Sequence, residues 1–315
     1  MTRTPVILIH GPWLHALSWQ SWADRFTSHG FDVIAPGWPG EPATVGEARR
    51  LPETLRPLGL DALTDHYARI VRSCATPPVI IGHSVGGLVA QHLLGAGLGR
   101  AAVAIAPAPI AGTLVGAPLT TASTERRGRS SAPGSPAAGS PVPGSPAYDS
   151  SGSGSPAYDS SASGSPASGN RAGEAGEAGE AGPVMLSAEQ FHDTFANAVP
   201  EEESTELFRH YVIPSSRRLL SDLGEVDGVP HPRRVVDTGN AERGPLLLVS
   251  GQEDRMVPDD VTRAVYKLYG DSTAPSDLKQ FPDRAHSLTI DKGWRAVADH
   301  VLAWLAGHGI HGDRS

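Results

Sequence analysis

The sequence predicts an α/β protein with a mostly parallel sheet of about six strands and helices on both faces. Two observations support this. Short, uninterrupted apolar runs alternate along the chain with longer stretches in which apolar residues recur at helical spacing, the pattern of βαβ units. A Gly-x-Ser-x-Gly turn, residues 82–86, also stands directly between an apolar run and a helix-compatible segment.

Each expected strand is a short apolar run that ends in a glycine, a proline or a polar residue. Such continuous runs are typical of strands buried on both faces of a sheet. The expected strands are residues 5–10, 31–35, 79–83, 101–106, 246–251 and 278–282. The expected helices are residues 18–29, 60–74, 85–97, 258–269 and 294–305, with more helix after residue 186. Residues 41–59 show no clear period.

The composition changes abruptly between residues 123 and 183. This stretch has almost no aliphatic residue beyond alanine, and it contains a ten-residue repeat that begins at Gly144 and recurs from Gly154. Such a segment cannot bury enough apolar surface to offset the entropy lost on ordering. We therefore expect a disordered, low-complexity insertion at 123–183.

The overall composition excludes several classes of function. A formal net charge of −8 argues against a nucleic-acid surface or an anionic membrane as partner. The single cysteine, Cys74, excludes an internal disulfide and suits a reducing compartment. No stretch approaches the roughly 20 apolar residues of a membrane span. A cytoplasmic protein that acts on a small molecule is the default expectation, with the oligomeric state left open.

The turn at Ser84 has the features of a nucleophile turn. Gly82 and Gly86 leave room for a tight strand-to-helix connection that lifts the serine hydroxyl above the sheet. The helix that follows offers free amide N–H groups to a developing oxyanion. A serine nucleophile also needs a base and a group that orients the base.

Residues of those two types follow the last two expected strands. Asp254 comes just after the strand at 246–251, and His286 comes after the strand at 278–282. In a parallel sheet both positions lie at the carboxyl edge, beside Ser84. Glu253 and Asp259 are the alternative acids, and Asp254 is favoured.

Taken together, these residues resemble the α/β-hydrolase-fold serine hydrolases, with the order Ser84, Asp254, His286. His10-Gly11 after the first strand belongs to the same resemblance, which covers nearly the whole chain apart from the insertion. It implies Ser84 as nucleophile, His286 as general base and then acid, and Asp254 as the orienting acid. It also implies that the chain begins at the family's third strand.

The resemblance further implies a small helical cap. On this basis residues 1–122 and 244–315 form the hydrolase core, and residues 184–243 form the cap and a return segment. In the family, the oxyanion hole uses the amide after the nucleophile, here Val85, and the amide that follows His-Gly. The latter residue is Pro12, which has no N–H. Either the Trp13 amide replaces it, or the oxyanion hole is weaker.

Aromatic residues near the expected site predict an apolar substrate pocket. Trp13 and Trp38 stand on strand-end loops, and Phe191 and Phe195 share one helical face in the cap. Three histidines, His10, His15 and His83, surround the same edge of the sheet. We expect no metal or cofactor, because no carboxylate or cysteine joins these histidines at metal-ligand spacing. His10 and His83 are expected to be hydrogen-bonded packing residues.

The sequence thus favours a carboxylesterase acting on a small or medium apolar ester through an acyl-enzyme. The same triad also serves thioesterases, amidases, carbon–carbon bond hydrolases and cofactor-free haloperoxidases, so these alternatives stay open. A non-catalytic ligand-binding protein on the same scaffold is a further alternative.

Overall fold

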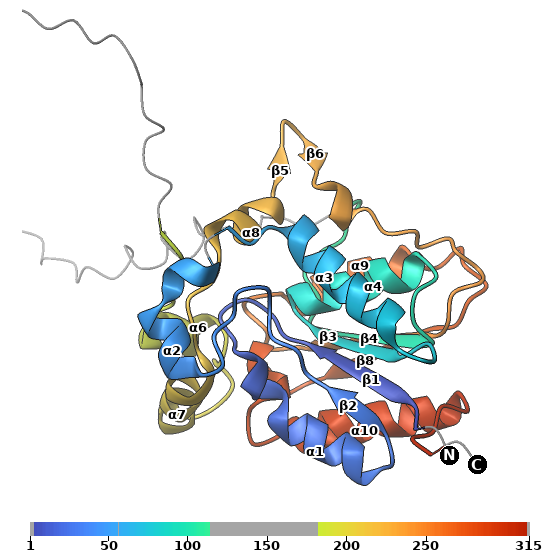
Figure 1. The fold of residues 1–315 in the computed structure, drawn as a ribbon, viewed down its shortest axis with the longest axis horizontal. Coiled ribbons are helices and arrows are strands. Elements are labelled where there is room, and N and C mark those ends of the chain that lie inside the picture. The colour runs from blue at the N-terminus through green and yellow to red at the C-terminus, as the bar shows by residue number, and fades with distance from the viewer. Residues whose placement is uncertain (1–2, 56, 114–181, 314–315) are drawn as a thin grey trace, which may run out of the picture. The chain divides into compact units, whose positions relative to one another are not determined.

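A six-stranded sheet forms the centre of the fold (Figure 1). The structure is a computed structural model that describes residues 3–55, 57–113 and 182–313. The strand order is β2-β1-β3-β4-β7-β8, and every pair of neighbours is parallel. The strands are β1 (Pro5–Ile9), β2 (Asp32–Ile34), β3 (Val79–His83), β4 (Ala101–Ile105), β7 (Leu246–Gly251) and β8 (Ser276–Phe281).

Alternate strand residues face two separate hydrophobic cores. In β1, Ile7 and Ile9 belong to one core, whereas Val6 and Leu8 belong to the other, and all four side chains are fully buried. Successive side chains of a strand point to opposite faces, so a strand covered on both faces needs an unbroken apolar run. The predicted sheet and its strand count are confirmed.

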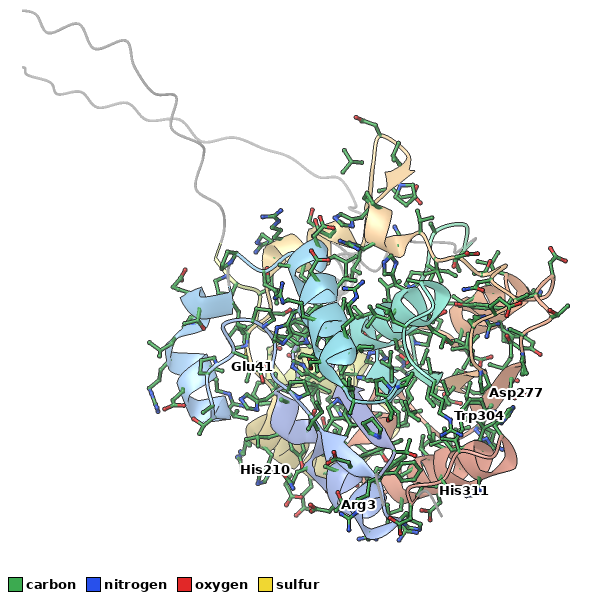
Figure 2. All side chains as sticks on the ribbon, turned by 45° about the vertical axis from the view of Figure 1, so that its right-hand side comes forward. Arg3, Glu41, His210, Asp277, Trp304 and His311 are labelled. Carbon is green, nitrogen blue, oxygen red and sulfur yellow. The ribbon has the colours of Figure 1, made fainter. Side chains whose placement is uncertain are left out.

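Helices cover both faces of the sheet, as Figure 1 shows. One core contains α1 (Gln20–Ser28) and α10 (Trp294–Gly307), and the other contains α3 (Leu60–Ser73), α4 (Val85–Gly95) and α9 (Asp259–Lys267). At the sheet edge, the indole Nε1 of Trp304 in α10 donates to Asp277 Oδ2 of β8 at 2.8 Å (Figure 2). No helix within the described ranges is both long and apolar enough to span a membrane.

The segment after residue 182 forms three short helices, α6 (Ala188–Thr194), α7 (Glu201–Tyr211) and α8 (Arg217–Asp222). Ser187 and Gln190 form a reciprocal capping box that starts α6, and the three glutamates of the first turn of α7 favour its positive N-terminal end. The segment then makes a two-stranded hairpin, β5 (Glu225–Val226) and β6 (Val229–Pro230), and a 3₁₀ turn at Pro232–Arg234.

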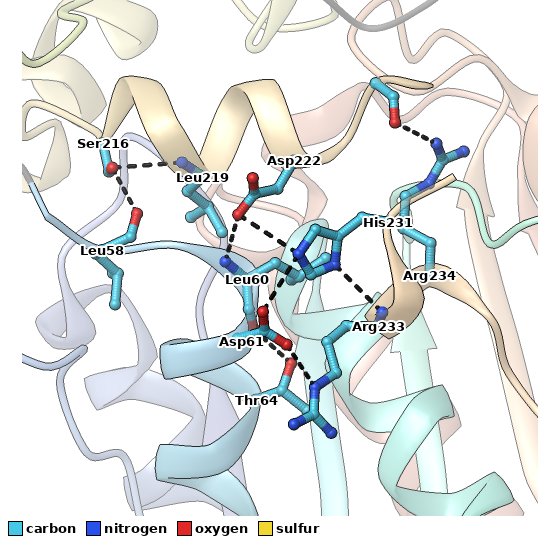
Figure 3. A network of polar contacts seen from close by, with 11 residues as sticks. Leu58, Leu60, Asp61, Thr64, Ser216, Leu219, Asp222, His231, Arg233 and Arg234 are labelled. Atoms are coloured by element: carbon cyan, nitrogen blue, oxygen red, sulfur yellow. Dashed lines mark hydrogen bonds and ion pairs between the residues drawn. The ribbon is translucent and has the colours of Figure 1, made fainter. Parts of the chain in front are cut away.

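Polar contacts attach the return segment, here residues 216–233, to the start of α3 (Figure 3). Asp222 Oδ2 accepts the Leu60 amide N–H at 2.8 Å and so caps α3, and Ser216 Oγ donates to the Leu58 carbonyl at 2.6 Å. Arg233 Nε forms an ion pair with Asp61 Oδ1 at 2.9 Å. The return segment is thereby attached to the core helix that precedes β3.

Two elements differ from the sequence-based expectation. Residues 41–59, which show no period, form α2 (Val45–Arg50) and a 3₁₀ turn at Pro52–Leu55, with Thr44 Oγ1 accepting the Glu47 amide at 3.2 Å. These elements are too short for a period to appear. The hairpin β5–β6 was also not expected. Nearly all of the predicted insertion at 123–183 lies outside the described residues.

Backbone contacts at two glycines set how closely α4 approaches the sheet. A Cβ atom on Gly86 would lie 2.2 Å from the Ile9 carbonyl oxygen of β1, and one on Gly82 would lie 2.0 Å from the Gly86 carbonyl oxygen. Real Cβ atoms do not come this close to a carbonyl oxygen. Only glycine at both positions allows α4 to start where it does.

We predict that Gly86→Ala lowers the free energy of unfolding by about 3 kcal/mol, because the methyl group would force β1 and α4 apart. Gly46→Ala in α2 is the matched control: its Cβ would lie 3.6 Å from the nearest atom, in Arg50, and it should raise stability by about 0.5–1 kcal/mol. Urea unfolding of both variants measures the difference. Equal midpoints for Gly86→Ala and wild type would contradict this packing.

Candidate active site

Ser84 lies at a strained turn between β3 and α4. Its backbone has φ 56° and ψ −118°, a conformation that costs a non-glycine residue about 1–3 kcal/mol. Its amide donates to the Ile105 carbonyl at 2.9 Å, and its carbonyl accepts from the amides of Gly87, Leu88 and Ala108. These bonds on both sides hold the turn, and the side chain lies at the carboxyl edge of the sheet, 6% exposed.

The loop after β1 passes directly against this turn. A Cβ on Gly11 would lie 2.6 Å from Ser84 Cβ and 3.1 Å from the His83 carbonyl oxygen. Glycine is required here because any side chain would collide with the serine. The backbone of residues 10–13 is thereby brought next to the serine.

His286 and Asp254 form a buried pair at the same edge. His286 Nδ1 lies 2.7 Å from Asp254 Oδ2, and both side chains are at most 1% exposed. The other carboxylate oxygen, Oδ1, accepts the amides of Met256 and Val257 at 2.8 Å each. These two bonds leave Oδ2 directed at the imidazole, and the imidazole in turn donates its Nδ1 proton.

The two alternative acids are placed elsewhere. Asp259 accepts hydrogen bonds from Ser250 and Gln280 and pairs with Arg263 at 3.0 Å, and Glu253 is exposed. Neither carboxylate has a contact with His286. Of the three candidates, Asp254 is the one that the fold brings to the histidine.

The second nitrogen of His286, Nε2, is buried and has no hydrogen-bond partner among the described residues. Because Nδ1 is directed at Asp254, Nε2 is the ring nitrogen left to accept a proton. The Phe195 ring stands edge-on to the imidazole, with ring centroids 4.6 Å apart. The arrangement provides a shielded base oriented by a carboxylate.

His83 connects the serine turn to the histidine loop. Its Nε2 donates to the His286 carbonyl at 3.0 Å, and the two rings lie 4.5 Å apart. Burial, together with the nearby His286 and His10, places the pKa of His83 well below its usual value. His83 is therefore neutral, and it is the hydrogen-bonded packing residue that the sequence predicts.

Two backbone amides near Ser84 are free to donate. The N–H of Val85, the first residue of α4, and the N–H of Trp13 have no protein acceptor among the described residues. Trp13 has φ 63°, and its carbonyl accepts the Ile213 amide at 3.0 Å. Pro12 offers no N–H. Trp13 and Val85 thus each supply an unpaired amide near Ser84.

The four aromatic residues proposed for the pocket are all buried. Phe195 packs on His286, and Phe191 stacks on Phe195 with centroids 4.9 Å apart. Trp38 stacks on His10 at 4.6 Å, and the Trp13 indole donates to the Val184 carbonyl at 3.2 Å. The phenylalanines thus lie against the base, whereas Trp38 lies against the loop that begins at His10.

The segment that contains α6 and α7 is bonded to the loop that carries Asp254 and to the loop that carries His286. The Phe195 carbonyl accepts the Ser287 amide at 2.8 Å, and Asn197 Nδ2 donates to the Glu253 carbonyl at 2.8 Å. Sequence reasoning missed Asn197, because nothing in its neighbourhood in the sequence marks a partner 56 residues away. In the described parts of the chain, no group of three or more His, Cys, Asp or Glu residues is arranged to hold a metal ion.

Comparison with known families agrees with this geometry. The sequence profile of the alpha/beta hydrolase family matches residues 6–300. The chain belongs to that family. No curated protein sequence matches this alpha/beta hydrolase significantly.

Solved structures share the fold at low sequence identity. A methylesterase from Arabidopsis is 13% identical, with a TM-score of 0.57 and coverage of 96% of this chain and 99% of that one. A monoacylglycerol lipase from Paleococcus ferrophilus is 16% identical, with a TM-score of 0.57 and coverage of 96% and 94%. A pyrethroid hydrolase from Sphingobium faniae is 18% identical, with a TM-score of 0.55 and coverage of 97% and 98%. At these identities the likeness concerns the fold.

We predict that His83 makes the stability of this alpha/beta hydrolase depend on pH. Below about pH 6.5 the unfolded chain protonates His83, whereas the folded chain does not, so the unfolded state binds more protons and stability falls as the pH falls. Wild type should therefore lose up to about 1.4 kcal/mol per pH unit more than His83→Gln below pH 6.5. Urea unfolding between pH 5 and 8 measures both slopes. Identical slopes would show that His83 is charged when folded.

Proposed function

We propose that this alpha/beta hydrolase is a serine hydrolase that cleaves carboxylic esters of small or medium apolar substrates. The observation that carries the proposal is the buried His286–Asp254 pair, 2.7 Å apart, with Nε2 unpaired at the edge of the sheet where Ser84 stands on a strained turn. A base held in one tautomer, at the same sheet edge as a serine on such a turn, is an arrangement suited to nucleophilic acyl transfer.

In the proposed reaction, Ser84 Oγ attacks the ester carbonyl carbon while His286 Nε2 takes the hydroxyl proton. Asp254 stabilises the imidazolium that forms, without accepting its proton. The tetrahedral intermediate expels the alcohol, which receives the proton from Nε2, and an acyl-enzyme remains. Water then repeats the sequence: Nε2 takes a proton from water, and the water oxygen attacks the acyl carbon. The intermediate expels Ser84 Oγ, which receives the proton back from Nε2, and the carboxylic acid is released.

We further propose that the amides of Val85 and Trp13 bind the oxyanion. Val85 opens α4, so its N–H is one of the unpaired donors at a positive helix end. Trp13 follows the proline that lacks an N–H, and its left-handed backbone conformation leaves its own N–H unpaired. This assignment gives the hole the usual two donors despite Pro12.

The apolar preference rests on Phe191 and Phe195, which pack on one another beside His286, and on Trp13 and Trp38 of the facing loops. Apolar and aromatic lining is typical of sites for small molecules. The names of the similar solved structures, a methylesterase, a monoacylglycerol lipase and a pyrethroid hydrolase, are consistent with a hydrolase on this fold.

A fluorophosphonate probe tests the proposal, because it labels serines activated by a base. We expect labelling of wild type and none of Ser84→Ala, together with hydrolysis of p-nitrophenyl esters across a chain-length series. A thioester and an anilide measured in parallel identify thioesterase or amidase activity. Absence of labelling in wild type would instead indicate a ligand-binding protein on this scaffold.

We predict that Asp254→Asn lowers kcat by about 10²–10⁴-fold while the fold is kept. The asparagine carbonyl can still accept the amides of Met256 and Val257, but its NH₂ would face His286 Nδ1 and favour the wrong imidazole tautomer. Asp260→Asn, at an exposed position in the first turn of α9, is the control and should leave kcat unchanged. Comparable kcat values for the two variants would remove Asp254 from the proposed triad.

We predict that Pro12→Leu changes kcat by less than about threefold, because the Trp13 amide already serves as the second donor. If the hole had one donor, restoring an N–H at position 12 should raise kcat by about 10²–10³-fold, the usual effect of such a donor. Steady-state ester hydrolysis, with thermal unfolding as a check on folding, separates the two outcomes. A large increase would contradict the role of Trp13.

A further inference from the structure

Glu41 is a buried carboxylate that the proposed reaction does not use. It follows β2 in a loop rich in proline and glycine, yet its side chain is only 1% exposed, whereas His210 and Arg3, labelled with it in Figure 2, are exposed. Burial of a charged group is costly unless it is paired and hydrogen-bonded. The partners of Glu41 therefore indicate what it does.

Those partners stand at the two ends of the loop that carries Trp13. Glu41 Oε2 lies 3.0 Å from His10 Nε2, at the end of β1. Glu41 Oε1 accepts the Ala16 amide N–H at 3.0 Å, at the start of the next 3₁₀ turn, and lies 3.6 Å from His15 Nε2. One carboxylate thus bridges residues 10 and 16 from outside the loop.

The two histidines beside Glu41 are bonded differently. His10 Nδ1 donates to the Gly11 carbonyl at 3.0 Å, and its Nε2 lies 3.0 Å from Glu41 Oε2. His15 Nδ1 accepts the Leu17 amide at 3.1 Å, and its Nε2 donates to the Pro42 carbonyl at 2.9 Å. Both nitrogens of His15 thus have other partners, whereas Glu41 is the partner of His10 Nε2 among the described residues.

The charge state of Glu41 agrees with this pairing. Burial alone would raise the pKa of Glu41, but the interaction with His10, the hydrogen bond from Ala16 and the nearby His15 outweigh burial and lower it below the ordinary glutamate value. The pair is further enclosed by Trp38, whose ring stacks on the His10 imidazole at an interplanar angle of 16°. The contact of Glu41 with His10 and Ala16, called the clamp below, is therefore charged and fully enclosed.

The loop between the clamped ends needs an external constraint. Trp13 holds a positive φ of 63°, which bulky residues rarely adopt, and within the loop the Leu14 amide reaches the Gly11 carbonyl at only 3.4 Å. The direction of the Trp13 N–H depends on this conformation. A loop of this kind relaxes unless its surroundings determine it.

We propose that Glu41 is a positioning residue for the oxyanion hole: by pairing with His10 and accepting from Ala16, it holds residues 10–16 so that the Trp13 amide points at the oxyanion. This inference rests on the proposed function, since it requires a reaction that develops an oxyanion beside Ser84. A donor aimed at charge that appears only in the transition state contributes to kcat and little to substrate binding.

The test compares Glu41→Gln with Glu202→Gln, an exposed glutamate of α7, using a p-nitrophenyl ester. The glutamine side chain keeps an oxygen for the Ala16 amide but loses the charge that holds His10. We expect kcat to fall at least about tenfold with KM within about twofold, and the affinity for a phenylboronic acid, whose adduct with Ser84 resembles the tetrahedral intermediate, to fall in parallel. Glu202→Gln should match wild type in all three quantities.

A second variant addresses the same clamp without removing the charge. Ala16→Pro deletes the N–H that donates to Glu41, and proline fits there because Ala16 is the first residue of its 3₁₀ turn and His15 has an extended backbone, with φ −86° and ψ 152°. We expect kcat to fall about fivefold at unchanged KM. If Glu41→Gln does not fold, the kcat of Ala16→Pro alone tests the role of Glu41.

An unchanged kcat, or a loss confined to KM, in the folded variants would overturn the role of Glu41 while leaving the proposed function intact. Failure of the fluorophosphonate probe to label wild type would overturn the proposed function, and the role of Glu41 with it. Labelling of wild type that Ser84→Ala abolishes, combined with the kcat and boronate losses, supports both.

Discussion

The hydrogen bond from His83 to the carbonyl of His286 joins two parts of the site that are 203 residues apart in the sequence. The bond places a neutral, buried His83 beside the His286 ring, where an imidazolium would oppose the positive charge that the proposed acyl transfer places on His286. The bond fixes the backbone of the histidine loop against the serine turn. The Asp254 carboxylate then has only to orient the ring.

Much of the fold was predictable because it depends on local apolar pattern. The strands of a parallel sheet buried on both faces must be continuous apolar runs, and six such runs became the six strands. The short helix α2 and the hairpin β5–β6 were not predicted, since six residues span too few turns to display a period and two-residue strands carry no alternation. Their formation depends on tertiary contacts.

The candidate site also contains residues that the sequence predicted and residues that it did not. Ser84, Asp254 and His286 follow strands, so the sheet topology alone brings them to one edge. The sequence already favoured Asp254 over Asp259, but the reason that Asp259 lies apart from His286 needed the structure: its carboxylate accepts from Ser250 and Gln280 instead. Glu41 was not predictable: it stands in a loop of prolines and glycines, and its partners are set by how that loop folds over the end of β1.

Besides the contacts of Glu41 at the two ends of its loop, Trp13 makes two bonds of its own that bear on the order in which the chain folds as it is made. The indole donates to the Val184 carbonyl, 171 residues later, and the Trp13 carbonyl accepts the Ile213 amide. Contacts of such sequence separation form late, since the chain between them must first be ordered or looped out. A nascent chain therefore completes the loop at Trp13 only after residue 213 has left the ribosome. Ser84 is therefore synthesised well before completion of the loop that supplies the Trp13 amide in the proposed reaction.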